Sequence, residues 1–495
     1  MFKKILIANR SEIARRIIAA AKEMDIQTVA IYSDPDAQAI FVREADEAYP
    51  LNGIEAKETY LDVEKVLAIA KTAGVDAIHP GYGFLSENAD FASSCAQAQI
   101  KFIGPSPEVI KKLGSKTASK EIAKIAKVPS VPGMQTFDEK NIKEIESKVG
   151  FPLLIKAAAG GGGKGMRIVT KGEEFTEALQ AAKREGLAFF KDDTVFIERY
   201  IENPKHIEVQ LLGDEHGNLI HLFERECSVQ RRHQKMIEES PSPSLNPKLR
   251  QKICEAAIKI AKAAHYSSAG TAEFLLDHQG NFYFLEVNTR LQVEHPITEA
   301  VTGIDLVKAQ IRIAAGEKLW LKQKDIVQRG HAIECRLYAE DPENNFLPSD
   351  GKVGLLFEPS RPGIRIDSAL EQGQDILPYY DPMLAKLITW GADRPEALIK
   401  TSKMLADFIL LGTRHNLDFL GYTLAHPDFI DGTYHTHSVA KWIDPYLSLR
   451  KEEAQRLEGL ADLLAKTKTN TAQQPTKSFA GNNFTLKELE NFRNV

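Results

Sequence analysis

The chain has 495 residues, of which 43% are hydrophobic and 26% charged, and its formal net charge is −5. This length predicts roughly three domains with buried cores, and the composition is that of a soluble globular protein. The small negative charge gives no general attraction to nucleic acid or acidic membranes, and no segment has the roughly 18 uninterrupted apolar residues of a membrane span. The four cysteines lie far apart without a CxxC pair, so we expect reduced thiols in a cytoplasmic protein.

Residues 1 to about 112 alternate apolar and amphipathic segments, which predicts a parallel sheet covered by helices. The expected strands are KKILIA, TVAIY, AIHP and KFIG, and the first expected helix covers Glu12 to Met24. A dinucleotide-binding fold would place GxGxxG after the first strand, but NRSEIA stands there, which argues against nicotinamide chemistry. HPGYGFLSEN (79–88) is either a ligand-binding turn at a strand end or a loop that joins domains.

A glycine-rich loop follows in the next region, from about 113 to 335. The apolar run Phe151 to Ala157 precedes GGGGKG (160–165), and MRIV (166–169) resumes a strand. A glycine run lets the backbone approach a ligand and offers N–H groups to phosphate oxygens. It is not a Walker loop, because Lys164 is followed by glycine and then by a strand. We expect a hairpin lid over phosphates, with Lys156 buried and paired with an anion; the alternative is a merely mobile hairpin tip.

The stretch FLEVNTRLQVEHP (284–296) alternates apolar and polar residues, which predicts an extended strand with a polar face from Glu286 to Glu294. A turn centred between Gln279 and Gly280 would place Glu273 opposite Glu286. Facing carboxylates repel unless a divalent cation lies between them, and carboxylate and amide oxygens are the ligands that Mg²⁺ accepts. The alternative is a half-exposed sheet with a solvated polar face.

After Cys335 the pattern becomes β-rich, with expected strands in GKVGLLFE, GIRIDSAL and LAKLITW and a closing helix near Glu396 to Ile409. Beyond about residue 447 the chain is charged and then rich in Thr, Gln and Asn. This composition predicts a helix followed by a flexible segment.

Four long motifs together resemble biotin carboxylase, an ATP-grasp enzyme: HPGYGFLSEN, LIKAAAGGGGKGMR, RECSVQRRHQK and EVNTRLQVEHPITE. The likeness runs from about residue 1 to 446, and RLYAEDP and YYDPMLAKLITW look most like acyl-CoA carboxylases of the methylcrotonyl and propionyl type. It implies an α/β pre-ATP-grasp domain (1–112), an ATP-grasp domain (113–335) with a lid lobe at about 131–203, a β-rich C-terminal domain (336–446) and a tail (447–495). Ser11 departs from the glycine that is usual in the family.

The resemblance implies that ATP phosphorylates bicarbonate to carboxyphosphate, whose CO₂ is transferred to the ureido nitrogen of biotin. None of the seven methionines is followed by lysine, so the Met-Lys-Met attachment motif is absent and biotin is expected on a separate chain. The expected partners are a biotin carboxyl carrier protein or biotinylated subunit and a carboxyltransferase subunit, in a homodimer or larger complex. The final acyl acceptor is not determined, because that chemistry belongs to the carboxyltransferase.

Family roles carried onto matching positions give the expected site residues. ATP is expected to contact Lys116, Lys156, Gly161, Gly162, Gly163, Lys164, Gly165, Glu198, Arg199, Ile201, His206, Gln230 and His233. The metal set for Mg²⁺ or Mn²⁺ is Glu273, Glu286 and Asn288, and the bicarbonate set is Arg290, Gln292 and Val293. The catalytic set adds to Arg290 a base, Glu294, a lysine that steadies the transferred groups, Lys235, and an arginine that stabilises the biotin anion, Arg336.

Three alternatives stay open at this stage. Arg336 and Glu294 could form only a structural ion pair. The chain could be another ATP-grasp ligase, one that passes an acyl phosphate to an amine, although EHPITE and RRHQK favour bicarbonate. It could also be a nucleotide-binding regulatory subunit without turnover, although every expected catalytic position is occupied.

Overall fold

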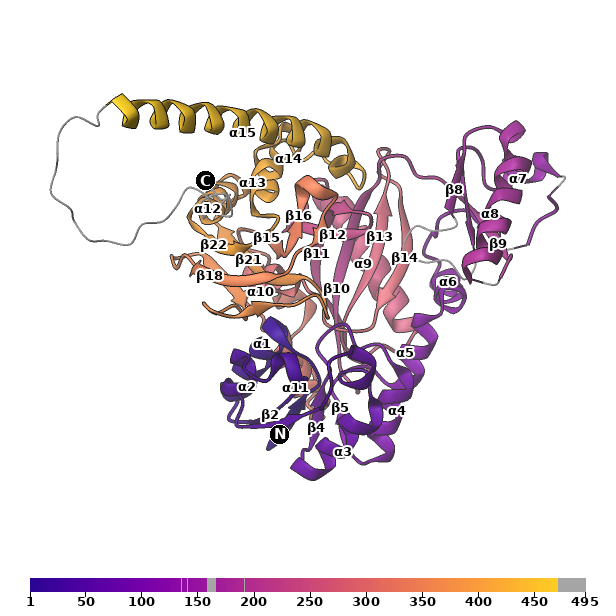
Figure 1. Cartoon of the computed structure of the whole chain (residues 1–495). Coiled ribbons are helices and arrows are strands. Elements are labelled where there is room, and N and C mark those ends of the chain that lie inside the picture. Colours follow the sequence, from indigo (N-terminus) through magenta and orange to yellow (C-terminus); the bar gives the residue numbers. More distant parts are fainter. Residues whose placement is uncertain (135, 140, 158–165, 191, 471–495) are drawn as a thin grey trace.

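The computed structural model describes residues 1–470 except for 135, 140, 158–165 and 191. The N-terminal segment forms a layered α/β body, drawn in indigo to violet in Figure 1. Long strands in magenta, pink and orange stand above that body, and a small lobe projects to one side of them (Figure 1). The yellow C-terminal helix extends along the opposite end of the molecule (Figure 1).

The N-terminal body contains a five-stranded parallel sheet in the order β3-β2-β1-β4-β5, which confirms the predicted parallel sheet. Its strands are β1 (Lys4–Ile7), β2 (Gln27–Tyr32), β3 (Glu47–Pro50), β4 (Ala77–His79) and β5 (Lys101–Phe102). Its helices are α1 (Ser11–Lys22), α2 (Ile40–Glu44), α3 (Val63–Ala73), α4 (Ala89–Gln97) and α5 (Pro107–Gly114). The prediction missed β3, a short edge strand whose residues are only half-buried or exposed.

Ser11 has a backbone φ of +59°, in the left-handed region that glycine adopts without strain. This geometry gives a physical reason for the glycine that is usual in the resembling family. Serine at this position carries a modest conformational cost, on the order of 1 kcal/mol. The turn at Ser11 leads directly into α1, whose first residues include the buried Glu12.

The small lobe contains a four-stranded sheet in the order β6-β9-β7-β8. Its strands are β6 (Gly133–Met134), β7 (Leu153–Ala157), β8 (Met166–Val169) and β9 (Val195–Arg199), and its helices are α7 (Ile142–Lys148) and α8 (Phe175–Phe190). Helix α6 (Lys116–Ile125) leads into the lobe. Strands β7 and β8 pair antiparallel, with Lys156 opposite Met166, as a hairpin lid requires. The glycine loop itself lies outside the described residues.

The central sheet has eight strands in the order β14-β13-β10-β11-β12-β15-β21-β19, all antiparallel. They are β10 (Lys205–Gly213), β11 (Leu219–Arg231), β12 (Gln234–Ser240), β13 (Ser268–Leu276), β14 (Phe282–Asn288), β15 (His331–Tyr338), β19 (Ile364–Ser368) and β21 (Met383–Gly391). Helix α9 (Pro247–Ala263) packs on β10 and β11, and α10 (His295–Thr302) packs on β11, β12, β15 and β21; α11 (Leu306–Ala314) follows. Strand β15 runs through the domain boundary predicted after residue 335.

Strands β13 and β14 form the predicted hairpin, with Glu273 directly opposite Glu286. The predicted turn centre is wrong, because Leu276 pairs with Phe282 and the turn is therefore centred on Gln279 itself. A β-bulge after Glu273 adds one residue to β14 and restores the predicted carboxylate pairing.

The prediction that the extended strand continues to Glu294 is also wrong. Strand β14 ends at Asn288, and α10 begins at His295 with Pro296 in its first turn. Proline fixes a φ that suits a helix start, so the chain turns before it. The turn buries the side chains of Gln292 and Glu294, which an extended strand would have left on its polar face.

The remaining elements complete the C-terminal region. They are β16 (Glu340–Asp341), β17 (Leu347–Pro348), β18 (Gly351–Phe357), β20 (Asp375–Ile376), β22 (Ile409–Thr413), α12 (Arg394–Asp407), α13 (Leu417–Ala425), α14 (Pro427–Ile430) and α15 (Ser438–Asn470). The predicted segments GKVGLLFE, GIRIDSAL and LAKLITW contain β18, β19 and β21, and α12 is the predicted closing helix. No helix within the described part of the chain is long and apolar enough to cross a membrane.

Candidate active site

A cavity of about 1380 Å³ opens between the small lobe, the central sheet and the first turns of α15. Most of the predicted site residues line it: Lys156, Glu198, Arg199, Ile201, His206, Gln230, His233, Lys235, Glu273, Glu286, Asn288, Arg290, Gln292, Val293 and Arg336. Glu294 lies behind this surface with a fully buried side chain. Lys116 begins α6, but its side chain, like Gly161–Gly165, lies outside the described residues.

Lys235 is the centre of a charged cluster on the floor of the cavity. Its Nζ donates to Glu208 Oε2 at 2.6 Å, to Glu273 Oε1 at 2.9 Å and to Glu294 Oε1 at 2.7 Å. An ammonium group has three protons, so these bonds use all of its donors. The three acceptors come from β10, β13 and the turn before α10, and Lys235 therefore ties these elements to β12.

Burial and charge act in opposite directions on these groups. Burial raises the pKa of the Glu273 and Glu294 carboxyls, but the neighbouring cations together outweigh burial and leave both pKa values well below the ordinary range. These neighbours are Lys235 and His206 for Glu273, and Lys235, Arg336 and Arg225 for Glu294. Burial alone would lower the pKa of Lys235, whereas the surrounding carboxylates hold it well above its ordinary value. For Glu208 burial prevails, and its pKa is raised. Lys235, Glu273 and Glu294 are accordingly charged at neutral pH.

Glu208 is a member of this cluster that the sequence prediction missed. It lies opposite Glu273 in the β10–β13 pair, so Glu208, Glu273 and Glu286 form a row across three adjacent strands. The fully buried Arg225 donates from Nε to Glu208 Oε1 at 2.5 Å. The argument that facing carboxylates need a cation applies to Glu208 as well as to Glu273 and Glu286. It requires the pairing of β10 with β13 to be known, and no short turn between these strands indicates that pairing in the sequence.

Arg336 holds Glu294 from the other side. Its Nη2 donates to Glu294 Oε2 at 2.8 Å, and its Nε donates to Glu238 Oε1 at 2.6 Å. Burial raises the pKa of Glu238 to about 7, against the attraction of Arg336. The ion pair considered as an alternative from the sequence is thus present, and each oxygen of Glu294 has its own cation.

The three predicted metal ligands meet along the β13–β14 pair. Asn288 Nδ2 donates to Glu273 Oε1 at 2.8 Å, and Glu286, opposite Glu273, has an exposed side chain that lines the cavity. His206 Nε2 contacts Glu273 Oε2 at 3.0 Å, and the ligand atoms of His206, Glu208 and Glu273 lie within 4.8 Å of one another. Carboxylate oxygens at a cavity wall fit Mg²⁺, so the donor set suits the predicted ion.

On the lobe side of the cavity, the burial of Lys156 differs from the prediction. The residue is half-buried rather than buried, and its Nζ donates to Glu198 Oε2 at 2.6 Å. Lys120, which the prediction missed, pairs with the other oxygen of Glu198. Burial raises the pKa of Glu198, but the two lysines lower it below the ordinary value. The expected anion beside Lys156 is therefore a protein carboxylate in this structure.

The remaining predicted ATP-binding residues have different surroundings. Arg199 is exposed and donates from Nε to Val149 O at 2.8 Å, whereas Ile201 is buried. Gln230 is buried and its Nε2 lies 3.4 Å from His206 Nδ1, so it connects the lobe side to the acidic row. His233 is exposed in the turn between β11 and β12, with a φ of +70°.

Arg290 is held between two segments distant in sequence. Its Nε donates to Glu87 Oε2 at 3.1 Å, and its Nη1 donates to Gln292 Oε1 at 3.1 Å. Glu87 belongs to HPGYGFLSEN, and it also accepts the backbone N–H of Thr289 at 3.2 Å. That motif therefore contacts the cavity wall rather than serving only as a loop between domains.

A charged cavity between a small α/β lobe and an antiparallel sheet defines an ATP-grasp ligase, and comparisons with known proteins agree. Residues 1–110 match the biotin carboxylase N-terminal domain, 115–322 the ATP-binding domain of the carbamoyl-phosphate synthase L chain, and 334–441 the biotin carboxylase C-terminal domain. The chain belongs to the biotin carboxylase family, which confirms the resemblance and the fold class expected from the sequence.

Individual relatives are similar over most of the chain. Biotin carboxylase 1 of Bacillus subtilis (strain 168) is 47% identical over 450 residues, which are 90% of this chain and 99% of that protein. The mitochondrial methylcrotonoyl-CoA carboxylase subunit alpha of Mus musculus is 50% identical over 436 residues, which are 88% of this chain but only 61% of that relative.

A solved structure gives the same result. The biotin carboxylase domain dimer of Hydrogenobacter thermophilus 2-oxoglutarate carboxylase, in complex with MgADP, ADP and bicarbonate, has a TM-score of 0.84. It is 46% identical and covers 90% of this chain and 98% of its own.

We expect Lys235→Met to destabilise the protein most at high pH. Without their shared cation, the buried Glu208, Glu273 and Glu294 should have pKa values above the unfolded value of about 4.3. A carboxyl whose pKa is raised by folding loses its contribution to stability as the pH rises through that pKa. The free energy of unfolding should fall by about 3 kcal/mol at pH 8 and by clearly less at pH 5.

Urea unfolding at the two pH values tests this expectation. Lys148→Met is the matched control, because Lys148 pairs with Glu144 on an exposed helix and its loss should cost less than about 0.5 kcal/mol at either pH. A loss in Lys235→Met that does not depend on pH would contradict the assignment of Lys235 as the shared cation.

Proposed function

We propose that this chain carboxylates biotin with bicarbonate and ATP, through carboxyphosphate. The observation that carries the proposal is the position of Glu294, a buried and ionised carboxylate held by Lys235 and Arg336 next to the predicted bicarbonate residues. A carboxylate fixed in this way can accept one proton from a substrate while two cations offset the negative charge that gathers around it.

The ATP half of the reaction belongs to the lobe and the acidic row. Lys116, Lys156 and the loop Gly161–Gly165 bind the phosphates, and Glu198, Arg199, Ile201, His206, Gln230 and His233 bind the nucleoside and orient it. Glu273, Glu286 and Asn288 would hold Mg²⁺ or Mn²⁺, which would supply positive charge to neutralise the phosphate groups. Lys156 donates to Glu198 at 2.6 Å and would exchange this carboxylate for a phosphate oxygen when ATP enters, since both partners are anions.

The carboxylation half belongs to the floor of the cavity. Arg290, Gln292 and Val293 bind bicarbonate, and Glu294 takes its proton as a bicarbonate oxygen attacks the γ-phosphorus and ADP leaves. Carboxyphosphate then divides into CO₂ and phosphate, and the ureido nitrogen of biotin passes its proton to the released phosphate and bonds to CO₂. Lys235 steadies the transferred groups, and Arg336 stabilises the negative charge on the biotin oxygen.

The proposal includes partners and a compartment. Biotin arrives on a carboxyl carrier protein or biotinylated subunit, a carboxyltransferase subunit uses the product, and the chain works as a homodimer or larger complex in the cytoplasm. The H. thermophilus relative is described as a dimer, and the four cysteines here are buried thiols, which supports these points. The acyl acceptor stays undetermined.

The proposal also keeps the division into 1–112, 113–335 with the lobe at about 131–203, 336–446 and 447–495. The three matched family ranges support it, although β15 joins the second and third parts within one strand.

ADP formation by the purified chain, measured with and without bicarbonate and free biotin, tests the function. We expect ADP formation to require bicarbonate and carboxybiotin to form when biotin is added. ADP formation that depends on an amine instead would favour another ATP-grasp ligase. No turnover under any of these conditions would favour a regulatory nucleotide-binding subunit.

Glu286→Gln should abolish metal-dependent turnover while the protein stays folded. The change removes one of two facing carboxylate charges, and relief of their repulsion should stabilise the metal-free protein by a few tenths to about 1 kcal/mol. Calorimetric titration with Mn²⁺ and nucleotide should show weakened metal binding, whereas Glu255→Gln, at an exposed position of α9, should behave as wild type. Clear destabilisation of the metal-free variant would indicate a structural role for Glu286.

Arg336→Lys should separate the two halves of the reaction. Lysine keeps a cation near Glu294 but loses the planar fork that can reach a biotin oxygen. Carboxybiotin formation should fall by about 10² to 10³, and bicarbonate-dependent ADP formation by less than about tenfold.

The matched control is Arg394→Lys, because Arg394 places a similar fork on the buried Glu239 at 2.7 and 3.0 Å, outside the cavity lining. It should affect neither activity selectively. An equal fall of both activities in a folded Arg336→Lys protein would assign Arg336 to the ATP half.

A further inference from the structure

Lys386 is a charged residue that the proposed mechanism does not use. It lies in β21 with no exposed surface, between apolar and small residues of LAKLITW. A buried ammonium is costly unless it is paired and hydrogen-bonded. The groups that contact its ammonium therefore indicate which part of the structure its charge stabilises.

The Lys386 ammonium contacts three parts of the chain. Its Nζ donates to the backbone oxygen of Val293 at 3.2 Å, and it lies 3.1 Å from Glu12 Oε2 and 3.5 Å from Asp367 Oδ2. Glu12 belongs to α1 of the N-terminal body and Asp367 to β19, so the lysine joins both to the turn before α10.

Strand register places Lys386 beside Arg336. The two residues are direct partners in the antiparallel β15–β21 pair, and Asp367 is the partner of Lys386 on the other side. Directly opposite residues project from the same face of a sheet. Arg336 and Lys386 accordingly reach the same short segment, one at the Glu294 carboxylate and the other at the preceding carbonyl.

Among the hydrogen bonds of the described residues, the Val293 carbonyl is the one in this turn that accepts from a residue distant in sequence. The Gln292 oxygen accepts from His295 Nδ1 at 2.7 Å, and the Glu294 oxygen accepts from the Ile297 N–H at 3.4 Å, both within the turn. The Val293 carbonyl and the Glu294 N–H belong to one planar peptide unit. A hydrogen bond that holds the Val293 carbonyl therefore restricts rotation of this peptide unit. The unit lies between the Val293 N–H and the Glu294 side chain, so it helps to set the direction of both.

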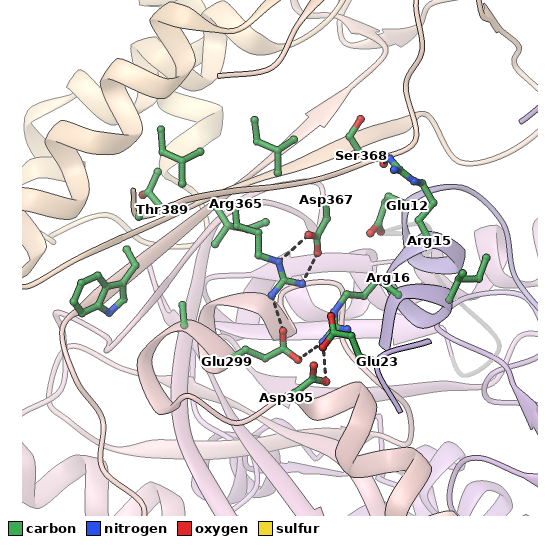
Figure 2. Close-up of a pocket in the computed structure, with 18 of the residues that line it drawn as sticks. Glu12, Arg15, Arg16, Glu23, Glu299, Asp305, Arg365, Asp367, Ser368 and Thr389 are labelled. Atoms are coloured by element: carbon green, nitrogen blue, oxygen red, sulfur yellow. Dashed lines mark hydrogen bonds and ion pairs between the residues drawn. The ribbon is translucent and has the colours of Figure 1, made fainter. Parts of the chain in front are cut away.

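Asp367, one of the anions that face Lys386, is itself held in place. Asp367 accepts two hydrogen bonds from Arg365, at 2.8 and 2.7 Å, and Arg365 also donates to Glu299 Oε2 at 2.7 Å (Figure 2). Glu12 and Asp367 line a second cavity of about 850 Å³ (Figure 2). Removal of the lysine would leave Asp367 with Arg365 but would leave Glu12 without a cation.

We propose that Lys386 is a positioning residue for bicarbonate, which acts by holding the Val293–Glu294 peptide unit in the orientation that binding and proton removal require. This inference rests on the proposed function, and it adds a residue of the C-terminal region that does not line the reaction cavity. Because the nucleotide contacts lie on the lobe side, loss of Lys386 should affect bicarbonate and spare ATP.

The test is steady-state kinetics of the full chain carrying Lys386→Met, with ADP formation followed at varied bicarbonate and at varied ATP. The KM for bicarbonate should rise by about tenfold to a hundredfold, the range for loss of a hydrogen bond from a charged donor. The KM for ATP should stay within about twofold, since uniform damage would move both constants. The double variant Glu12→Gln and Lys386→Met is a second test, because it also removes the Glu12 charge that loses its partner when Lys386 is replaced.

The matched control is Lys400→Met, because Lys400 also donates to a backbone carbonyl, that of Trp390 at 3.0 Å, and pairs with Glu396 at 2.8 Å on α12. It should leave both KM values unchanged. An unchanged bicarbonate KM in a folded variant, or equal rises for bicarbonate and ATP, would overturn the proposal. Loss of the fold in both Lys386 variants would also overturn it, in favour of a structural lysine. Absence of bicarbonate-dependent turnover in the wild type would instead refute the proposed function.

Discussion

The structure around the active site depends on one ammonium group, that of Lys235, between three buried carboxylates. Carboxylates so close together cannot all ionise without a cation among them. Arg225 and Arg336 add two more cations, whereas Glu238 adds a fourth carboxylate. The excess negative charge is reduced because burial raises the pKa of Glu238 to about 7. Pairing with Lys235 and Arg336 keeps Glu294 ionised despite its complete burial.

The central sheet brings these charges together from distant parts of the chain. Strands β10, β13 and β14 supply the acidic row, and β12 supplies Lys235. Strands β15 and β21 supply Arg336 and Lys386 as direct neighbours, so the C-terminal region is part of the site rather than an appended domain. Through Glu12, the N-terminal body pairs with Lys386, which in turn holds the Val293 carbonyl before α10. A substitution that disturbs any of these three regions should therefore also disturb the proposed bicarbonate site.

Local sequence patterns predicted those parts of the site that a single turn or strand connects. The Glu273–Glu286 pair was predicted because a short hairpin links its strands, even though the turn centre was wrong and a bulge corrected the register. The strand beyond Asn288 was predicted wrongly, because alternation of polar residues does not distinguish a strand from a turn that buries apolar and polar side chains alike. Lys156 was expected to need an anion, and Glu198 supplies one.

The sequence by itself determined the family, the parallel N-terminal sheet, the identity of the charged residues and their order along the chain. Those features depend on local composition and on motifs of about ten residues, which short-range periodicity and turn chemistry specify. Only the tertiary structure decided which charges meet: Glu208 with Glu273, Arg336 with Glu294, and Lys386 with the Val293 carbonyl. These contacts join residues far apart in sequence, and their pairing follows from strand order and register, which local patterns do not encode.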